Sequence, residues 1–145
     1  MESKGKSFKS GPQSLRVGID LVEVKKIRET LEQREALQES VFTSDELSYA
    51  SQQKNPYNSL AALFAAKEAV FKALGTGLSG EMDWREVEVE WGGCGRAVLR
   101  LCGRTASVAD EMGVVQHALS LSRTREYGMA VVVLTAIASR TSPKE

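Results

Sequence analysis

The longest helical pattern in this 145-residue chain is NSLAALFAAKEAVFKAL, residues 58–74. Apolar side chains recur in it at spacings of three and four residues, and alanine, a strong helix former, fills much of the remainder. Gly75 follows directly and suits the left-handed backbone conformation that ends many helices. The pattern therefore predicts one long helix that ends at Leu74.

Strands grouped in hairpins surround this helix in the sequence. Five segments predict strands: residues 15–22, 84–91, 97–101, 114–122 and 128–138. The first is an apolar run that predicts a buried strand, and the other four pair as two hairpins across short turns. Such grouping favours a single antiparallel α+β domain, with the sheet packed on the long helix, over a doubly wound parallel sheet.

Shorter helices are expected at three further places. Residues 23–31 place apolar side chains on one face, and residues 104–112 are closed by a glycine. Thr43 and Glu46 fit a capping box, so a helix should start there. The folded domain is expected to cover residues 15–138, with disordered tails at residues 1–14 and 139–145.

Bulk composition excludes several classes of protein. The length suits one domain, and a formal net charge of zero argues against a dedicated nucleic-acid binder. No apolar run is long enough to span a bilayer, and the first residues do not resemble a signal peptide. A cytoplasmic location is therefore expected, with Cys94 and Cys102 as reduced thiols.

An isolated acid interrupts the apolar run VGIDLVEV at residues 17–24. A buried carboxylate without a partner is costly, so Asp20 needs a cation, a hydrogen-bond donor or a place at the end of the strand. An exposed acid, or a cap at the junction of strand and helix, is the alternative explanation.

A second acid and a lysine lie four residues apart on the long helix, so the side chains of Glu68 and Lys72 are neighbours. A surface ion pair is one explanation. Two features favour a site instead: the pair borders the apolar stripe, and it precedes the sequence Gly-Thr-Gly at 75–77, where backbone amides can approach a phosphate. Asp20 and Glu68 could then share a divalent cation, and Lys72 could meet a phosphate.

Together the two segments resemble the holo-[acyl-carrier-protein] synthases, the small 4'-phosphopantetheinyl transferases. That family carries G-x-D-[IL]-V-E-[IV] near the start and F-A-A-K-E-A-x-x-K-A-x-G-T-G later, and residues 18–24 and 64–77 match both patterns. The resemblance implies that Asp20 and Glu68 bind a metal ion, with Glu68 as general base. It implies that Lys72 contacts the phosphates of coenzyme A.

The implied reaction is transfer of phosphopantetheine from coenzyme A to a serine hydroxyl of an acyl carrier protein, with adenosine 3',5'-bisphosphate as the other product. Mg²⁺ suits this chemistry because it takes carboxylate and phosphate oxygens. Gly75 and Thr76 are expected to shape the phosphate pocket. The family binds its acidic carrier protein with a basic helix, which here implies contacts from Lys25, Lys26 and Arg28, mainly Lys26. The resemblance also predicts a homotrimer with coenzyme A between subunits.

Three positions depart from the family pattern. Aligned on Ser120, the family histidine falls on Ala118, one position after His117, which we keep as a candidate coenzyme A contact. Arg123 stands where His or Asp is usual and could contact a phosphate itself. The common G-K-P turn appears here as Gly-Arg-Ala at 95–97.

Two functions from other classes remain open on the sequence. One is a catalytically inactive relative that binds coenzyme A or a carrier protein; the retained acids and lysine speak against it. The other is an unrelated structural α+β domain whose acids serve as helix caps and surface pairs.

Overall fold

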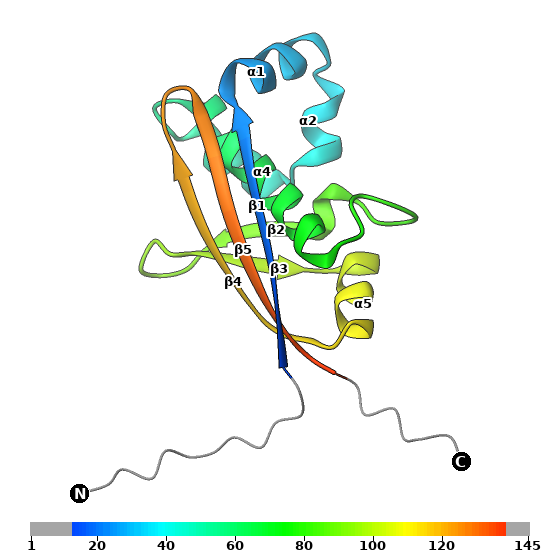
Figure 1. Cartoon of the computed structure of the whole chain (residues 1–145). Coiled ribbons are helices and arrows are strands. Elements are labelled where there is room, and N and C mark those ends of the chain that lie inside the picture. Colours follow the sequence, from blue (N-terminus) through cyan, green and yellow to red (C-terminus); the bar gives the residue numbers. More distant parts are fainter. Residues whose placement is uncertain (1–12, 139–145) are drawn as a thin grey trace, which may run out of the picture.

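The computed structural model describes residues 13–138, which form a three-stranded antiparallel sheet packed against one long helix (Figure 1). The three strands, in the spatial order β1-β5-β4, are β1 (Gln13–Glu23), β5 (Tyr127–Ile137) and β4 (Val114–Arg123). The helix is α4 (Pro56–Leu74). The expected antiparallel α+β architecture is confirmed.

The ends of the chain were expected to be disordered tails. Residues 1–12 and 139–145 lie outside the described residues. Gln13 and Ser14, which were assigned to the first tail, already belong to β1 and pair with β5. The ordered strand thus starts two residues earlier than the apolar pattern indicates.

Helix α4 has well-defined ends. It begins at Pro56, two residues before the predicted start, where the missing N–H of proline costs no helical hydrogen bond. The side chain of Asn55 accepts a hydrogen bond from the backbone N–H of Asn58 at 3.4 Å. At the other end, Gly75 adopts the left-handed conformation with φ 77°. None of the helices among residues 13–138 is long and apolar enough to cross a membrane.

A smaller hairpin packs beside the main sheet. It consists of β2 (Val87–Trp91) and β3 (Ala97–Leu101), and helix α5 (Gly103–Glu111) leads from it to β4. The hairpin and the helix agree with the sequence pattern. Residues 84–86, predicted as strand, instead form a short 3-10 turn, because the Asp83 side chain accepts a hydrogen bond from the backbone N–H of Arg85 at 2.8 Å.

Three short helices connect β1 to α4. They are α1 (Val24–Gln33), α2 (Ala36–Val41) and α3 (Ser44–Ser51). The capping box that predicted α3 is present: the backbone N–H of Glu46 donates to Thr43 Oγ1 at 3.2 Å, and the backbone N–H of Thr43 donates to Glu46 Oε1 at 2.9 Å. Helix α2 was not predicted, since it is six residues long and has no capping side chain.

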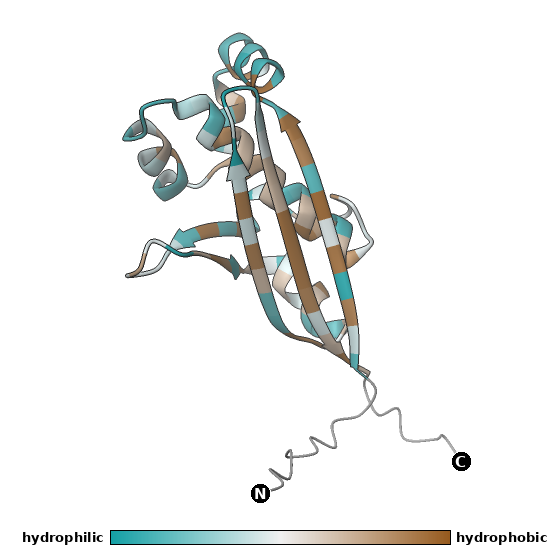
Figure 2. Ribbon diagram, turned by 60° about the vertical axis from the view of Figure 1, so that its left-hand side comes forward, coloured by the Kyte–Doolittle hydropathy of each residue, from teal (hydrophilic) through white to brown (hydrophobic). Residues whose placement is uncertain are grey.

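Strand β1 is not the buried strand that its apolar run predicted. Its large aliphatic side chains are 55–71% exposed: Leu15, Val17, Ile19 and Leu21. Figure 2 shows hydrophobic residues alternating with others along β1, whereas β5 is hydrophobic over most of its length. The aliphatic row faces away from α4, because a strand places alternate residues on opposite faces of the sheet.

From Ser14 to Asp20 the inner face of β1 carries small or polar residues, and α4 approaches it closely at Gly18. A Cβ atom on Gly18 would lie 1.8 Å from the backbone oxygen of Ala69 and 2.9 Å from the backbone nitrogen of Ala73. Only glycine permits this separation. The close approach fixes where the next inward residue of β1, Asp20, meets the helix.

A buried ion pair joins α4 to α3 and to the β2–β3 layer. Lys67 Nζ lies 2.7 Å from Glu46 Oε1, and both side chains are 0% exposed. The Lys67 ammonium also donates to the backbone oxygens of Trp84 and Val87, and Glu46 Oε2 accepts from the backbone N–H of Val89 at 3.1 Å. Burial lowers the pKa of Lys67, while the charge of Glu46 opposes that shift.

Candidate functional site

An ion pair joins β1 to α4 where the two elements meet. Lys72 Nζ lies 2.8 Å from Asp20 Oδ1 and donates a second hydrogen bond to the backbone oxygen of Ile19 at 3.1 Å. The Asp20 side chain is 16% exposed and the Lys72 side chain 53%, so the lysine can leave the carboxylate without unpacking the core. The hydrogen bond to Asp20 raises the pKa of Lys72.

Glu68 lies one helical turn before Lys72 and lines the same groove as Asp20. Partial burial raises the pKa of Glu68, and the negative charge of Asp20 raises it further, while Lys72 opposes both. A cation bound between the two carboxylates would offset the repulsion that Asp20 exerts on the ionised form of Glu68. The structure therefore brings together Asp20, Glu68 and Lys72, although 48 positions separate the two acids.

The groove beside these three residues has a volume of about 780 Å³ and walls that are largely apolar. Its apolar wall is formed by residues from α1, α2, α4 and the 3-10 turn, among them Ile27, Leu31, Leu37, Phe42, Phe64 and Trp84. Lys26 also lines it, whereas Lys25 and Arg28 do not. Of the three basic residues proposed to bind a partner, Lys26 is therefore the one that shares this groove with the acids.

The end of α4 is held by a residue that the sequence patterns did not reveal. Arg16 Nη1, on the inner face of β1, donates to the backbone oxygens of Ala73 at 3.4 Å and Leu74 at 3.3 Å. It thereby satisfies helix carbonyls that have no partner inside the helix. Gly75 and Thr76 follow in an exposed loop. A polar residue on the inward face of an otherwise apolar strand was the available signal.

His117 does not join this site within one chain. It lies on β4, the outer strand opposite β1, where it is exposed and pairs with Leu134 of β5. Ala118 pairs with Val133 and therefore points to the other face of the sheet. A β-bulge lies between Val114 and Gln116, before both positions. It therefore does not turn the His117 side chain to the face of the sheet that Ala118 occupies.

The other two departures from the family pattern meet on the same side as β4. Arg123 and the turn residues 95–97 line one pocket of about 660 Å³. The Arg123 guanidinium donates to Ser59 Oγ and to Gln53 Oε1. Neither Arg123 nor the turn lines the groove beside Asp20.

The chemistry of the two acids is compatible with a magnesium ion. Among residues 13–138 no group of three or more His, Cys, Asp or Glu side chains could hold a metal ion. Mg²⁺ is usually held by one or two carboxylates together with water and phosphate oxygens. Asp20 and Glu68 supply two carboxylates of that donor set, and the charge of Asp20 is one of the causes that raise the pKa of Glu68.

We expect Glu68 to titrate above the ordinary range of glutamate, and the substitution Asp20→Asn to lower its pKa. The reason is that Asp20 supplies one of the two causes that raise this pKa, while Lys72 continues to lower it. The side-chain carboxyl ¹³C shift of Glu68 against pH measures both values. Asp110→Asn, which removes an exposed acid on α5, is the control. An unchanged Glu68 titration in the Asp20→Asn variant contradicts the coupling.

The sequence and the fold match known proteins over most of the chain. Residues 16–132 match the model of the 4'-phosphopantetheinyl transferase superfamily. A holo-[acyl-carrier-protein] synthase of Caldanaerobacter subterraneus is 38% identical over 81% of this chain and 91% of the relative, and one of Moorella thermoacetica is 39% identical over 83% and 93%. A solved complex of the Chronobacterium ammoniagenes synthase with coenzyme A aligns with a TM-score of 0.75 and 30% identity, covering 87% of this chain and 99% of that one.

These likenesses extend from Arg16 to Val132 and include both acids, the lysine and the glycine-rich end of α4. The chain therefore belongs to the holo-[acyl-carrier-protein] synthase family of enzymes, within the 4'-phosphopantetheinyl transferase superfamily.

Proposed function

We propose that this chain transfers 4'-phosphopantetheine from coenzyme A to a serine hydroxyl of an acyl carrier protein, in a Mg²⁺-dependent reaction that releases adenosine 3',5'-bisphosphate. The observation that carries the proposal is that Asp20, Glu68 and Lys72 line the same largely apolar groove, with Lys72 paired to Asp20. The names of the relatives support the carrier protein as acceptor, and the complex with coenzyme A supports the donor.

Each of the three side chains has its own role in the proposed reaction. Asp20 and Glu68 would hold Mg²⁺, which when bound offsets the negative charge that develops on the leaving phosphate. Glu68 accepts the serine proton, directly or through a water. The serine oxygen bonds to the phosphorus that bears pantetheine, and the bond from that phosphorus to the bridging oxygen breaks.

Lys72 stabilises the leaving group in this scheme. Its ammonium is paired with Asp20 in the ligand-free chain, and its side chain is exposed enough to turn toward a phosphate. A positive charge placed where negative charge develops lowers the barrier to the reaction. The exposed Gly75-Thr76 loop directly after α4 gives the phosphates room beside the lysine.

A mass measurement tests the proposal. Apo carrier protein incubated with the chain, coenzyme A and Mg²⁺ should gain about 340 Da, the mass of one phosphopantetheine group. The gain should disappear when Mg²⁺ is removed with a chelator. Unmodified carrier protein, together with measurable coenzyme A binding, would assign the chain to the inactive relatives.

We expect Lys26→Glu to raise the Michaelis constant for carrier protein about tenfold and to leave that for coenzyme A nearly unchanged. Lys26 is 79% exposed and held only loosely by Glu23 at 3.9 Å, so its charge is available to an acidic partner. Lys25→Glu, on the same helix but outside the groove, is the comparison and should have the smaller effect on this constant. Activity should also fall with salt, because charges are screened over about 10 Å at 0.1 M. If the two charge reversals raised the Michaelis constant for carrier protein equally, the groove would not orient the carrier protein.

We also propose that the chain works as a homotrimer with coenzyme A bound between subunits. Among the described residues, an exposed aliphatic row lies on β1, at Leu15, Val17, Ile19 and Leu21. A row of this kind favours contact with a second copy.

Light scattering at micromolar concentration should therefore give three times the chain mass of 15.8 kDa. Val17→Asp should dissociate the assembly, because it places a charge within the aliphatic row. Leu78→Asp, at a 42% exposed position away from the sheet, should not. A monomer with full transfer activity would refute the proposal.

A further inference from the structure

The last turn of α4, like the last turn of any α-helix, leaves four backbone carbonyls without a partner inside the helix. The chain that follows satisfies two of them. The backbone N–H of Gly75 donates to the oxygens of Phe71 and Lys72, each at 3.0 Å, and the backbone N–H of Thr76 donates to Phe71 at 3.3 Å. The two carbonyls nearest the end of the helix therefore need a partner from elsewhere in the fold.

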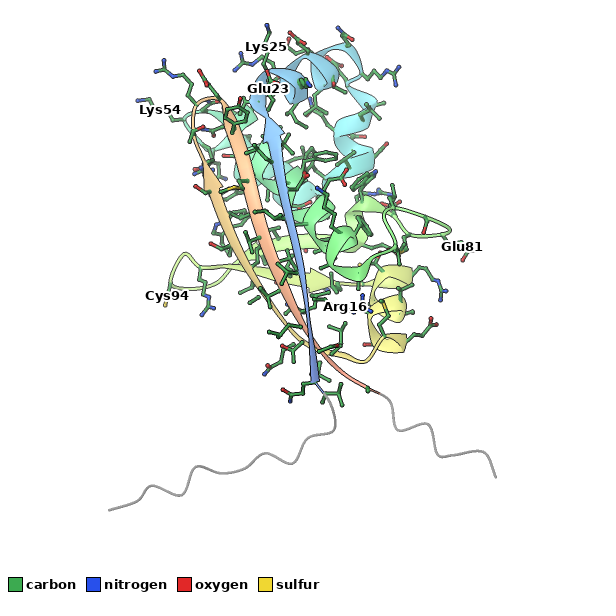
Figure 3. The ribbon with its side chains drawn as sticks, in the orientation of Figure 1. Arg16, Glu23, Lys25, Lys54, Glu81 and Cys94 are labelled. Atoms are coloured by element: carbon green, nitrogen blue, oxygen red, sulfur yellow. The ribbon has the colours of Figure 1, made fainter. Side chains whose placement is uncertain are left out.

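Arg16 supplies that partner from β1. Its Nη1 donates to the backbone oxygen of Leu74 at 3.3 Å and to that of Ala73 at 3.4 Å. These two residues are 1% and 3% exposed, so water has little access to their carbonyls. Figure 3 shows Arg16 beside the lower half of β1, below Glu23 at the upper end of the strand. The positive charge of Arg16 also offsets the partial negative charge at the C-terminal end of α4.

Arg16 shares one face of β1 with Gly18 and Asp20, because alternate residues of a strand point to the same side. All three contact the last two turns of α4. Gly18 lies against the backbone of the helix, and Asp20 Oδ1 lies 2.8 Å from Lys72 Nζ. Arg16 completes this row of contacts at the end of the helix, so one face of β1 fixes both where α4 lies and where it ends.

We propose that Arg16 is a positioning residue for Lys72: it keeps the last turn of α4 closed and so holds the Lys72 ammonium beside Asp20. Lys72 belongs to that turn. Without a donor at position 16, the carbonyls of Ala73 and Leu74 would be buried without hydrogen bonds, and the turn would open to reach water. The inference rests on the proposed function, because it gives Arg16 a part in the same transfer reaction.

Arg16→Met should lower kcat for phosphopantetheine transfer about tenfold, because Lys72 is then less often in place to stabilise the leaving phosphate. The Michaelis constant for carrier protein should stay nearly unchanged, since Arg16 does not line the groove that contains Lys26. The matched control is Arg100→Met, which removes a guanidinium from β3, where it pairs with Glu90 at 3.2 Å on the surface. The control should keep the wild-type kcat.

Arg16→Lys should recover most of the lost kcat. Both hydrogen bonds to the end of α4 come from a single nitrogen of Arg16, so one ammonium group can replace it. If circular dichroism shows that Arg16→Met is unfolded, Arg16→Gln takes its place, because the amide keeps a donor without the charge. The glutamine variant should then have a kcat below that of Arg16→Lys.

A double-mutant cycle distinguishes positioning of Lys72 from a general effect on the fold. In a Lys72→Met background, adding the Arg16 substitution should change the remaining transfer rate by less than twofold, because the side chain that Arg16 positions is already absent. If the Arg16 substitution lowered the rate by the same factor in both backgrounds, it would act independently of Lys72, and the inference would be wrong.

Hydrogen exchange provides a measurement that does not depend on activity. The amide N–H groups of Gly75 and Thr76 should exchange about tenfold faster in Arg16→Met than in the wild type, because their bonds close the last turn of α4. The amide of Val132, in the buried part of β5, should be unaffected. Unchanged exchange at Gly75 and Thr76 would show that Arg16 does not keep the turn closed.

The outcomes for the wild type and for the variants separate the two proposals. A wild-type chain that transfers no phosphopantetheine overturns the proposed function and this inference with it. A wild-type chain that transfers normally, with an unchanged kcat in Arg16→Met, overturns this inference alone. Equal losses of kcat in Arg16→Met and Arg100→Met would also overturn it, because the loss would then follow from removal of any surface charge.

Discussion

Asp20→Asn and Glu68→Gln should each lower the rate of phosphopantetheine transfer by about a thousandfold or more, because each removes a proposed metal-binding carboxylate and Glu68 is also the proposed base. The variants should remain folded. The raised pKa of Glu68 means that its ionised form is less favoured in the folded than in the unfolded chain. Glu68→Gln should therefore melt no lower than the wild type at neutral pH.

Both variants are measured by carrier-protein mass and by circular dichroism melting, with Asp110→Asn as control. Titration with Mg²⁺ should show weaker binding in Asp20→Asn. Turnover close to wild type in either variant at saturating Mg²⁺ would remove that residue from the site. Lost activity with a much lower melting temperature would instead show a structural role.

Lys67→Met should lower the free energy of unfolding by about 3–5 kcal/mol, because it leaves the carboxylate of Glu46 buried without its cation. For a domain of this size the melting temperature should fall by about 10–20 °C. Adding Glu46→Gln should recover part of the loss, because it removes the buried charge that has no cation, while its amide oxygen can still accept from one of the two backbone N–H groups, Thr43 or Val89, that the carboxylate accepts from.

Lys72→Met is the matched control, since it removes the same group from the same helix at an exposed position. It should melt within a few degrees of the wild type and lose most of its turnover. Comparison of the two variants thus distinguishes a lysine that stabilises the fold from one that acts in catalysis. If Lys67→Met melts like the wild type, the buried pair does not hold α4 in place.

Local patterns predicted the elements and the acids. Helix α4 and its glycine end followed from spacing and from backbone preference, and Thr43 with Glu46 located α3. Asp20, Glu68 and Lys72 were recognisable because the two segments that carry them are unusual in sequence. The residues alone left a shared cation site and separate caps or surface pairs open as alternatives, and the resemblance favoured the shared site, since nothing local relates β1 to the far end of α4.

The remaining features depend on long-range packing. Lys67 follows the spacing of the apolar stripe, yet only the fold shows that Glu46 and two backbone oxygens surround it. The aliphatic residues of β1 alternate as a strand requires, but periodicity does not say which face meets the helix. The contact of Arg16 with the end of α4 could not be predicted from the sequence either, because it also depends on which face of β1 meets the helix.

The glycine on β1 limits how this enzyme can change over evolution. The atoms that a side chain at position 18 would strike belong to the backbone of Ala69 and Ala73, so no replacement of a neighbouring side chain can make room for it. The only accommodation is a shift of α4 away from the strand. That shift would carry Glu68 and Lys72 away from Asp20. A substitution at position 18 should therefore lower both the stability of the fold and the activity, and second-site suppressors should be rare.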